Sequence, residues 1–486
     1  MTEGLLKAFW AYERALMADD LAAMDYLFAP GTCTLRGDTA GLLVGHDEIA
    51  AYRRARGGAP ARDILDVRVI PAGAEHALVV AVTAAHRGGR GLQTQLWRRE
   101  HHGDADRWLV VAAHVAPPPS TFDSAVWRVV GDPLVPATGT GALDGESVAV
   151  KDVFAVAGSA VGGGVPDFLS ERDVETGHAT ALRRLLDAGA SLRGIARTDQ
   201  FAYSLAGSNE HYGAPVNAVV PGALPGGSTS GPATAVALGA ASIGLGTDTA
   251  GSIRVPASYQ GLWGLRTTHG AVPREGMLPL APDFDTVGLL TRTADLLARA
   301  ASALLGAHTP ADLPLDLTGQ VKITEIADEL GDLAAVSAAF SVHQGWQAWQ
   351  AHGAWLEAHP GSVLGAPAER FAWAAGVTEE QDRRAQNVLH AAREHWDSLL
   401  GDDVLVLPSA GSAAPRVWAD PSTVQAAREA TLQLTCIAGV TGRPAVSAPL
   451  GTDSDGAPIG TCFVGPRGSD LQLVHHAFQT SRTADA

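Results

Sequence analysis

The sequence predicts two domains: a small α+β unit over residues 1–118 and a layered α/β domain over residues 128–486, joined by a linker at 119–127. Three observations support this. Consecutive prolines, Pro117 to Pro119, interrupt the chain. Before them, two helical patterns precede a series of strand-like runs, and after them strands alternate with helices and glycine-rich turns, as in α/β layers. At 486 residues the chain also exceeds the size of one ordinary domain.

The first domain is expected to open with two helices and to continue as a curved antiparallel sheet, which together form a small cone. The apolar positions that share one face of the first helix are Leu5, Phe9, Tyr12 and Leu16. Asp19 or Asp20 is a suitable cap for a second, shorter helix that ends at Phe28. The strand-like runs that follow are residues 64–70, 76–84, 93–99 and 108–115.

In the second domain, the first elements can be placed from their apolar runs and small residues. Residues 147–156 are expected to form a strand that carries Lys151. Residues 233–240 are expected to form a helix of small side chains, with Pro232 in its first turn, where proline is tolerated.

Further along, Thr378 and Gln381 have the spacing of a capping box, which predicts a helix that extends to about Leu400. Residues 404–407 are expected to form a buried strand. Residues 310–375 are rich in Ala, Asp and Leu, and their pattern indicates no chemistry.

Charge limits the classes of partner. The formal net charge is −17, from 35 basic and 52 acidic residues. Residues 1–120 hold 13 basic and 14 acidic residues, so the remainder carries 22 and 38, a net of −16. An acidic body of this size disfavours nucleic acid, tRNA-bound substrates and anionic membranes as partners. No run of 18 apolar residues predicts a membrane span.

The cysteines and histidines indicate neither a disulfide framework nor a metal site. Cys33, Cys436 and Cys462 are odd in number and far apart. The 17 histidines form no metal-ligand spacing. We therefore expect no metal and no cofactor. Charged residues early in the chain, such as Lys7 and Arg14, interrupt any signal-peptide apolar region and predict a cytoplasmic location.

Lysine is rare in this chain. Only Lys7, Lys151 and Lys322 occur, so arginine supplies 32 of the 35 basic residues. Arginine stays protonated in proteins, whereas a buried lysine can become neutral and act as a base. Lys151, within an apolar strand, fits that role; chance is the alternative explanation for this residue taken alone.

Two Gly/Ser segments follow about 75 residues after Lys151. The first is Gly226-Gly227-Ser228-Thr229-Ser230-Gly231, and the second is Gly246-Thr247-Asp248-Thr249-Ala250-Gly251-Ser252-Ile253-Arg254. Alone, the first would be read as a flexible turn, and Ser252 as a helix cap. The second lacks the Gly-Lys-Ser/Thr ending of a phosphate loop. Together with Lys151, their order and spacing favour catalysis.

These motifs resemble those of the amidase signature family, which hydrolyses amides with a Ser–Ser–Lys triad. The resemblance implies an α/β/α layered fold with a central mixed sheet. It assigns the catalytic positions to Lys151, Ser228 and Ser252, with Ser252 as nucleophile, Ser228 as the bridge and Lys151 as a neutral base. It also implies a cis peptide bond between Gly227 and Ser228.

An oxyanion hole is expected from the backbone N–H groups of the turn formed by Thr249, Ala250, Gly251 and Ser252. Asp248 and Arg254 are expected to hold this turn as a structural charge network, and Thr229 to support the site. The sequence departs from the family pattern at positions that leave the triad intact: Thr229 and Ser230 in the first motif, Pro232 after it, and Ala250 in place of a glycine. The C-terminal segments look most like the indole-3-acetamide hydrolase subgroup.

Residues 1–116 resemble the small NTF2-like domain that accompanies amidases of the cyanuric-acid and biuret pathway. The residues that carry this likeness are Phe9, Tyr12, Glu13, Ala15, Leu16, Gly45, His46, Ile49, Tyr52, Arg53, Gln93, Gln95, Trp97 and 111–115. The resemblance implies that Tyr12 and Arg36 belong to a second active site, in which Arg36 pairs with a carboxylate. Alternatively, Tyr12 packs in the core and Arg36 lies on the surface.

The sequence thus predicts an amidohydrolase that releases ammonia from a small primary amide through an acyl-Ser252 intermediate. One alternative is a carboxybiuret or biuret-type hydrolase in which the N-terminal domain is a second active site. A non-enzymatic alternative is a degenerate amidase that serves binding or assembly. A homodimer is expected, with the N-terminal domain as a candidate interface. The acyl group of the substrate stays open.

Overall fold

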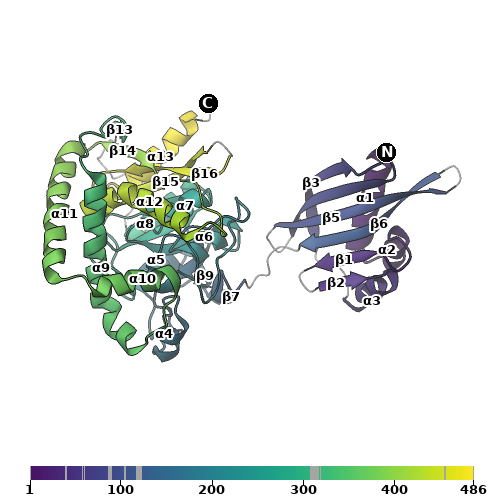
Figure 1. The fold of residues 1–486 in the computed structure, drawn as a ribbon, viewed down its shortest axis with the longest axis horizontal. Coiled ribbons are helices and arrows are strands. Elements are labelled where there is room, and N and C mark those ends of the chain that lie inside the picture. The colour runs from purple at the N-terminus through teal and green to yellow at the C-terminus, as the bar shows by residue number, and fades with distance from the viewer. Residues whose placement is uncertain are drawn as a thin grey trace. The chain divides into compact units, whose positions relative to one another are not determined.

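The computed structural model describes residues 2–38, 41–56, 59, 61–85, 90–102, 105–116, 123–306, 317, 319–453 and 456–484. It divides into two compact units, Met1–Thr121 and Phe122–Ala486 (Figure 1). The prolines at 117–119, and the first residues of the predicted linker at 119–127, lie outside the described residues. The exact domain limits therefore stay a prediction.

The smaller unit is a six-stranded sheet with helices against one face. Its helices are α1 (Thr2–Met17), α2 (Leu21–Leu27) and α3 (His46–Arg56). Its strands are β1 (Leu35–Asp38), β2 (Gly41–Val44), β3 (Arg62–Pro71), β4 (His76–Ala85), β5 (Arg90–His102) and β6 (Ala105–Ala116), in the order β2-β1-β6-β5-β4-β3. All pairings are antiparallel except that of β1 with β6.

The predicted face of α1 is confirmed, since its four apolar residues are all buried in the core of this unit. Asp20 caps α2 by accepting a hydrogen bond from the N–H of Ala23 at 3.0 Å, as expected for one of the two candidate caps. The helix α3 and the strands β1 and β2 were not predicted from the sequence. The helix His46–Arg56 is strongly polar and the two strands have four residues each, so none carries a periodic apolar pattern.

The larger unit is built on a ten-stranded mixed sheet. Its strands are β7 (Trp127–Val135), β8 (Ser147–Lys151), β9 (Ser191–Ala196), β10 (Ile243–Asp248), β11 (Trp263–Arg266), β12 (Thr286–Thr291), β13 (Gln320–Lys322), β14 (Val404–Pro408), β15 (Ala445–Thr452) and β16 (Pro458–Val464). They lie in the order β13-β14-β16-β15-β11-β12-β10-β8-β9-β7. Parallel pairs join β8 to β9 and β10, and β13 to β14, so the predicted mixed sheet is confirmed.

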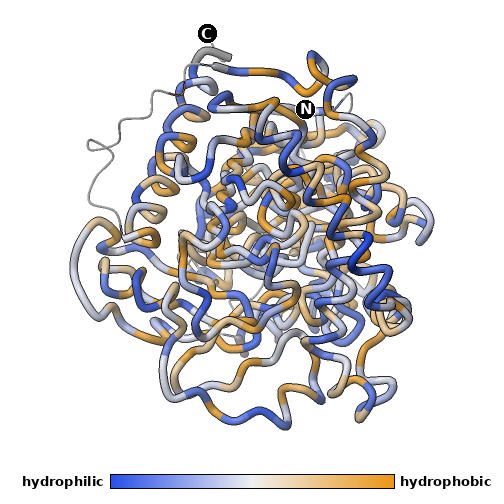
Figure 2. Tube along the Cα trace, turned by 90° about the vertical axis from the view of Figure 1, so that its left-hand side faces the viewer, coloured by the Kyte–Doolittle hydropathy of each residue, from blue (hydrophilic) through white to orange (hydrophobic). Residues whose placement is uncertain are grey.

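Helices form layers on both sides of this sheet. The helices are α4 (Pro166–Glu171), α5 (Thr180–Asp187), α6 (Ser230–Ala237), α7 (Arg254–Tyr259), α8 (Ala294–Leu305), α9 (Leu333–Ala358), α10 (Gly365–Ala375), α11 (Glu379–Leu400), α12 (Pro421–Thr441) and α13 (Asp470–Ala484), with a 3-10 turn at Gln200–Ala202. One hydrophobic cluster contains side chains of α5, α8 and α13. Two further clusters contain side chains of α6, α7, α9, α11 and α12. In Figure 2, orange segments fill the interior, while surface helices alternate between orange and blue.

Two predicted boundaries in this unit were wrong. Strand β8 ends at Lys151 instead of continuing to residue 156, because the N–H groups of Val153 and Phe154 turn back onto the Lys151 carbonyl at 2.7 and 3.1 Å. Helix α6 begins at Ser230, three residues before the expected start, and ends at Ala237. The capping box of α11 and the strand β14 are confirmed.

Among the described residues, no helix is long and apolar enough to cross a membrane. The predicted cytoplasmic location stays a prediction.

Candidate functional site

The strand β8 places Lys151 at the end of a buried, alternating sequence. Val148 and Val150 point into the core that α5 and α8 share, so Ala149 and Lys151 point to the opposite face of the sheet. Ala149 packs there in the same cluster as Ala235 of helix α6. The Lys151 side chain is 0% exposed. The side-chain nitrogen of Lys151 therefore lies beneath the N-terminus of α6.

The first Gly/Ser segment brings Ser228 onto this lysine. Lys151 Nζ donates hydrogen bonds to Ser228 Oγ at 2.8 Å and to Thr247 Oγ1 at 2.7 Å. The peptide bond between Gly227 and Ser228 is cis, as the resemblance implies. Thr198 Oγ1 donates to the Ser228 carbonyl at 2.8 Å, which fixes the backbone at this position.

Ser252 completes a continuous chain of polar groups. Its Oγ lies 2.9 Å from Ser228 Oγ, and both side chains are buried. Hydroxyl hydrogens rotate to suit their partners, so this pair of oxygens can pass a proton in either direction. The structure thus brings the three predicted triad residues, Lys151, Ser228 and Ser252, into one hydrogen-bonded line.

Burial sets the protonation of the lysine. Desolvation lowers the pKa of Lys151 to about 7, although the negative charges of Asp199, Asp285 and Asp248 act in the opposite direction. Burial likewise raises the pKa of the Asp199 carboxyl, against hydrogen bonds from Gly207, Ser204 and Ser230. A lysine with a pKa near neutrality is a base at physiological pH.

In the turn after β10, one of the four backbone N–H groups that the sequence predicts for an oxyanion hole is already hydrogen-bonded. The N–H of Gly251 donates to Asp248 Oδ1 at 3.0 Å and is therefore occupied. Within the described parts of the chain, the N–H groups of Thr249, Ala250 and Ser252 make no hydrogen bond. These three are the donors left for a developing negative charge.

Ala250 fits where the family pattern has a glycine. In the described residues, a positive φ outside glycine occurs at Asp19, Phe201 and Ala202, so Ala250 has an ordinary backbone. Gly251, by contrast, has a φ of 118°, which glycine adopts readily. The carbonyl of Ala250 accepts a hydrogen bond from Thr435 Oγ1 at 2.8 Å, which ties the turn to helix α12.

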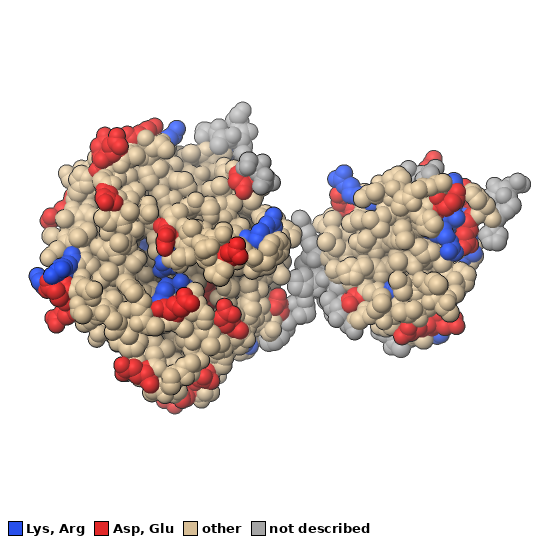
Figure 3. All heavy atoms as spheres, viewed as in Figure 1, with Lys and Arg blue, Asp and Glu red and all other residues tan. Residues whose placement is uncertain are grey.

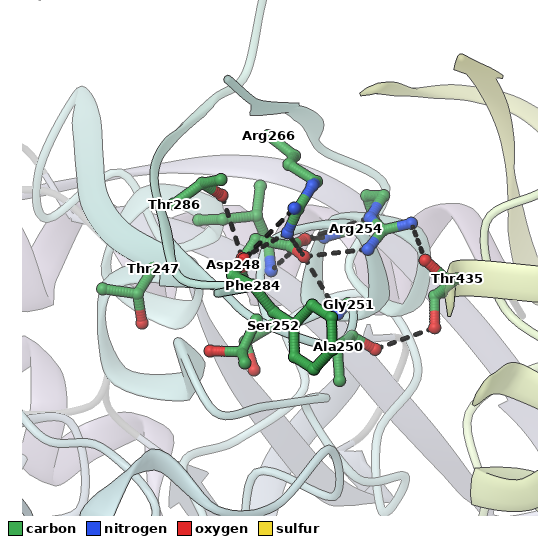
Figure 4. A network of polar contacts seen from close by, with 12 residues as sticks. Thr247, Asp248, Ala250, Gly251, Ser252, Arg254, Arg266, Phe284, Thr286 and Thr435 are labelled. Atoms are coloured by element: carbon green, nitrogen blue, oxygen red, sulfur yellow. Dashed lines mark hydrogen bonds and ion pairs between the residues drawn. The ribbon is translucent and has the colours of Figure 1, made fainter. Parts of the chain in front are cut away.

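Asp248 holds this turn through its carboxylate, as Figure 4 shows. Its carboxylate accepts hydrogen bonds from Arg254 Nη2 at 2.8 Å and Nε at 3.0 Å, and from Arg266 Nη1 at 3.1 Å. It also accepts the N–H groups of Gly251 and Ile253. Burial favours the protonated acid, but the two arginines and these hydrogen bonds lower the pKa of Asp248 well below its usual value.

Arg254 and Thr229 also make contacts of the supporting kind expected from the sequence. Arg254 Nη1 reaches the Thr435 carbonyl at 2.9 Å, and its side chain is 1% exposed. Thr229 Oγ1 donates to the Thr247 carbonyl at 3.2 Å. A side chain at Gly246 would place its Cβ 2.2 Å from Thr229 Cγ2, so only glycine allows this packing.

Four functional residues were missed by sequence reasoning. They are Thr247, Arg266, Asp285 and Thr435. Thr247 lay inside the second motif, so its position was a usable signal. The other three lie 14 or more residues beyond Ser252 and reach the site only through the fold. Asp285 Oδ1, for example, accepts a hydrogen bond from Thr249 Oγ1 at 2.6 Å.

A pocket adjoins the triad. It has a volume of about 590 Å³, within the usual range for small-molecule sites. Its wall includes Leu205, whose carbonyl accepts from the N–H of Gly227, and Val255, whose N–H donates to the Gly251 carbonyl. These two wall residues therefore contact the segments that carry Ser228 and Ser252.

In the smaller unit, Tyr12 and Arg36 are both buried. Tyr12 packs 6.0 Å from Phe28 and 6.2 Å from Trp97, ring centre to ring centre, as expected if it is a core residue. Burial raises the pKa of its hydroxyl, with the charge of Arg53 acting against this. Arg36 is 7% exposed, so the expectation that it lies on the surface was wrong; it donates to Asp38 Oδ2 at 2.7 Å.

Over the described ranges, no three His, Cys, Asp or Glu side chains are arranged to hold a metal ion. The thiols of Cys33, Cys436 and Cys462 are free.

Comparison with protein-family models gives two matches. A model described as Amidase matches residues 135–324 and 359–474, and a model described as AtzH-like matches residues 2–119. The unmatched residues 325–358 contain helix α9. Both matches agree with the resemblances seen in the sequence.

Individual proteins are similar over the larger unit. Amidase 1 of Arabidopsis thaliana is 31% identical over 410 residues, which cover 73% of this chain and 96% of the relative. The 2-amino-5-chloromuconic acid deaminase of Comamonas testosteroni is 33% identical over 374 residues, covering 69% and 80%. A solved structure, described as an unexpected vestigial protein complex that reveals the evolutionary origins of an s-triazine catabolic enzyme, matches with a TM-score of 0.62 at 25% identity, covering 70% and 84%. The assignment to the indole-3-acetamide hydrolase subgroup stays a prediction.

We predict that Asp248→Asn destabilises the larger unit by about 3–5 kcal/mol, because it leaves two buried guanidinium groups without their counter-ion. Urea unfolding of the full chain, followed by tryptophan fluorescence, measures this. The matched control is Asp295→Asn, since Asp295 is 78% exposed and pairs with Arg299 on the surface of α8; its effect should stay within about 0.5 kcal/mol. Equal effects of the two substitutions would contradict the structural role of Asp248.

Proposed function

The chain belongs to the amidase family and is a hydrolase of carbon–nitrogen bonds in amides, and we propose that it cleaves a small primary amide to a carboxylic acid and ammonia through an acyl-Ser252 intermediate. The observation that carries this proposal is the unbroken line from Lys151 Nζ through Ser228 Oγ to Ser252 Oγ, with separations of 2.8 and 2.9 Å. The continuous line also opposes the alternative of a degenerate, non-catalytic amidase.

In the first half-reaction, Ser252 Oγ attacks the amide carbon. Its proton passes to Ser228 Oγ as the Ser228 proton passes to neutral Lys151. The carbonyl oxygen becomes an oxyanion, which the free N–H groups of Thr249, Ala250 and Ser252 stabilise; each such donor typically contributes about 10²–10³ in rate. The carbon–nitrogen bond then breaks, and the proton returns through Ser228 to the leaving nitrogen, which departs as ammonia.

In the second half-reaction, water attacks the acyl-Ser252 ester. The same relay takes a proton from the water, and Ser252 regains its proton when the carboxylic acid leaves. The buried aspartates contribute to this cycle through their negative charges. The network around Asp248 holds the turn, and the charges of Asp199, Asp285 and Asp248 favour the lysinium formed during each proton transfer.

A second candidate function concerns the smaller unit. Tyr12 is electrostatically coupled to Arg53, Arg62 and Arg36 in the interior of this unit. Arg62 Nη2 donates to both oxygens of Glu13, at 3.0 and 2.9 Å. A buried tyrosine among cations favours the alternative of a second active site for carboxylated ureas. The pairing of Arg36 with Asp38 weakens it, because that charge is already compensated.

The outer face of the smaller sheet supports a homodimer. Ala77, Val79 and Ala81 of β4 are buried in the core beneath the helices, so the alternate residues Leu78, Val80 and Val82 face outward. On β5, Leu96 pairs with Leu78 and Leu92 with Val82 across the same face, and Leu92 is 51% exposed. We propose that a second copy covers this apolar face.

To test the amidase, ammonia release is measured over aryl-acetamides, aliphatic amides, biuret and carboxybiuret. Ser252→Ala should lower turnover of a plain amide at least about 10³-fold, and Tyr12→Phe should leave it unchanged. Turnover of carboxylated ureas that depends on Tyr12 would support the second active site. Retained activity in Ser252→Ala would contradict the acyl-serine mechanism, as would silence of the unmodified protein toward a fluorophosphonate probe.

The lysine mechanism predicts a pH dependence. Because burial lowers the pKa of Lys151 to about 7, the neutral base is lost as pH falls below that value, and kcat/KM should fall about tenfold per pH unit there. Lys151→Arg should abolish turnover despite keeping the charge, since arginine stays protonated. Lys322→Arg, at an exposed residue of β13, is the matched control and should retain full activity. A flat profile between pH 5.5 and 8.5, or an active Lys151→Arg, would contradict the neutral-lysine mechanism.

The dimer is tested by light scattering after size exclusion. The unmodified chain should elute with twice the mass of one chain, and Val80→Glu should give monomers because it places a charge in the apolar face. Leu42→Glu, at a 62% exposed position on β2, should remain dimeric. A monomeric unmodified protein would rule out the proposed interface.

A further inference from the structure

Two arginines meet at the junction of two pockets in the larger unit. Arg370 lies on helix α10 and Arg428 on helix α12, and both line the 590 Å³ pocket beside the triad. Both also line a neighbouring pocket of about 400 Å³, together with Tyr203. Figure 3 shows basic side chains inside a hollow near α10 and α12, with acidic side chains around it. The two guanidinium groups therefore face the space that a substrate would enter.

The polar partners of these two arginines are few. The Nε of Arg428 is buried and makes no hydrogen bond to any described residue. Arg370 Nε donates to the carbonyl of Tyr203 at 2.9 Å. Across the described part of the chain, no carboxylate lies within 4.0 Å of either guanidinium group. Both charges thus lack a counter-ion at contact distance.

The electrostatics agree with this geometry. Burial first, and then the positive charge of Arg428, lower the pKa of Arg370 to about 10, against the opposite effects of Tyr203, Asp199 and Glu369. Burial also lowers the pKa of Arg428, while the Tyr203 hydroxyl and Glu429 act in the opposite direction. Two like charges that share a half-buried site favour an anion between them.

Other buried arginines of the same unit behave differently. Arg254 and Arg266 share the Asp248 carboxylate, at 2.8 and 3.1 Å. The acidic residues that line the two pockets, Glu210, Glu369 and Glu429, are exposed to water, where their charges are screened. Structural pairing therefore explains Arg254 and Arg266 and leaves Arg370 and Arg428 unexplained.

Helix α12 fixes the distance from this pair to the reacting centre. Arg428 precedes Thr435 by seven residues, so both lie on one face, about 10 Å apart along the helix axis. Thr435 contacts the Ala250 carbonyl in the oxyanion turn. The wall of the 590 Å³ pocket also includes the apolar side chains of Leu205 and Val255 and the ring of Tyr259. A ligand that spans the pocket would have a reactive end, an apolar middle and an anionic end.

We propose that the substrate is an amide that carries a carboxylate at the end remote from the scissile bond, and that Arg370 and Arg428 bind this carboxylate. The pair would hold it with charge-assisted hydrogen bonds, which are shorter and stronger than neutral ones. An apolar spacer of several carbon atoms would lie along the pocket wall. This inference rests on the proposed amidase function and specifies its substrate class as monoamides of dicarboxylic acids.

The experiment compares monoamides of linear dicarboxylic acids, with about two to six methylene groups, against alkyl amides of equal length that end in a methyl group. The unmodified protein should prefer one carboxylated amide at least tenfold in kcat/KM. Arg428→Gln should lower kcat/KM for that substrate about 10- to 100-fold, mainly through KM, and should change the neutral amide less than about twofold. Arg384→Gln is the matched control, since Arg384 is 74% exposed on α11, and it should preserve the preference.

The outcomes separate this inference from the proposed function. Amide turnover without a carboxylate preference, or equal losses on both substrates in Arg428→Gln, would overturn the inference and leave the amidase intact. If no amide is hydrolysed, the proposed function fails. Calorimetric titration with glutarate then tests whether Arg370 and Arg428 bind a carboxylate. Binding that is lost in Arg428→Gln would support the carboxylate site, and absent binding would overturn it. Equal displacement of glutarate by inorganic phosphate at matched ionic strength would also overturn it, since the site would then bind anions in general.

Discussion

The buried carboxylate of Asp248 holds together the parts of the site that come from different regions of the sequence. It ends strand β10, accepts hydrogen bonds from the turn that carries Ser252, and neutralises Arg254 and Arg266. A buried ion pair is favourable only when its remaining hydrogen bonds are satisfied, and here backbone N–H groups supply them. The shape of the turn at residues 249–252 is thus held by contacts with a charged group in the core as well as by the glycine of the loop.

The same core lowers the pKa of Lys151, the proposed base. Strand alternation turns Lys151 away from the valine-rich face and under helix α6, where desolvation lowers its pKa to about 7. The three aspartates that oppose this shift are themselves held by hydrogen bonds, so the lysine is tuned between two fixed influences. Loss of a charge in the Asp248 network would therefore affect both stability and the protonation of the base, since these groups share one low-dielectric interior.

The arginines of the larger unit divide into two classes by their surroundings. Those at Asp248 are compensated within the protein, whereas Arg370 and Arg428 are left without a carboxylate at contact distance among the described residues. In a chain with a net charge of −17, an uncompensated basic pair inside a pocket is a local exception to the general field. That contrast connects substrate selection to helices α10 and α12, which lie far along the chain from the catalytic motifs.

The sequence by itself determined the family and the mixed α/β architecture, and its motifs located Lys151, Ser228 and Ser252, the predicted triad that the structure joins by hydrogen bonds. It also located Asp248 and Arg254, since they lie within the second motif. Only the tertiary structure decided that Arg266, Asp285 and Thr435 join the site, that Asp248 accepts the N–H of Gly251, and that Arg370 and Arg428 line one pocket. These contacts link residues separated by up to 185 positions, and local periodicity carries no information about which distant strands and helices will meet.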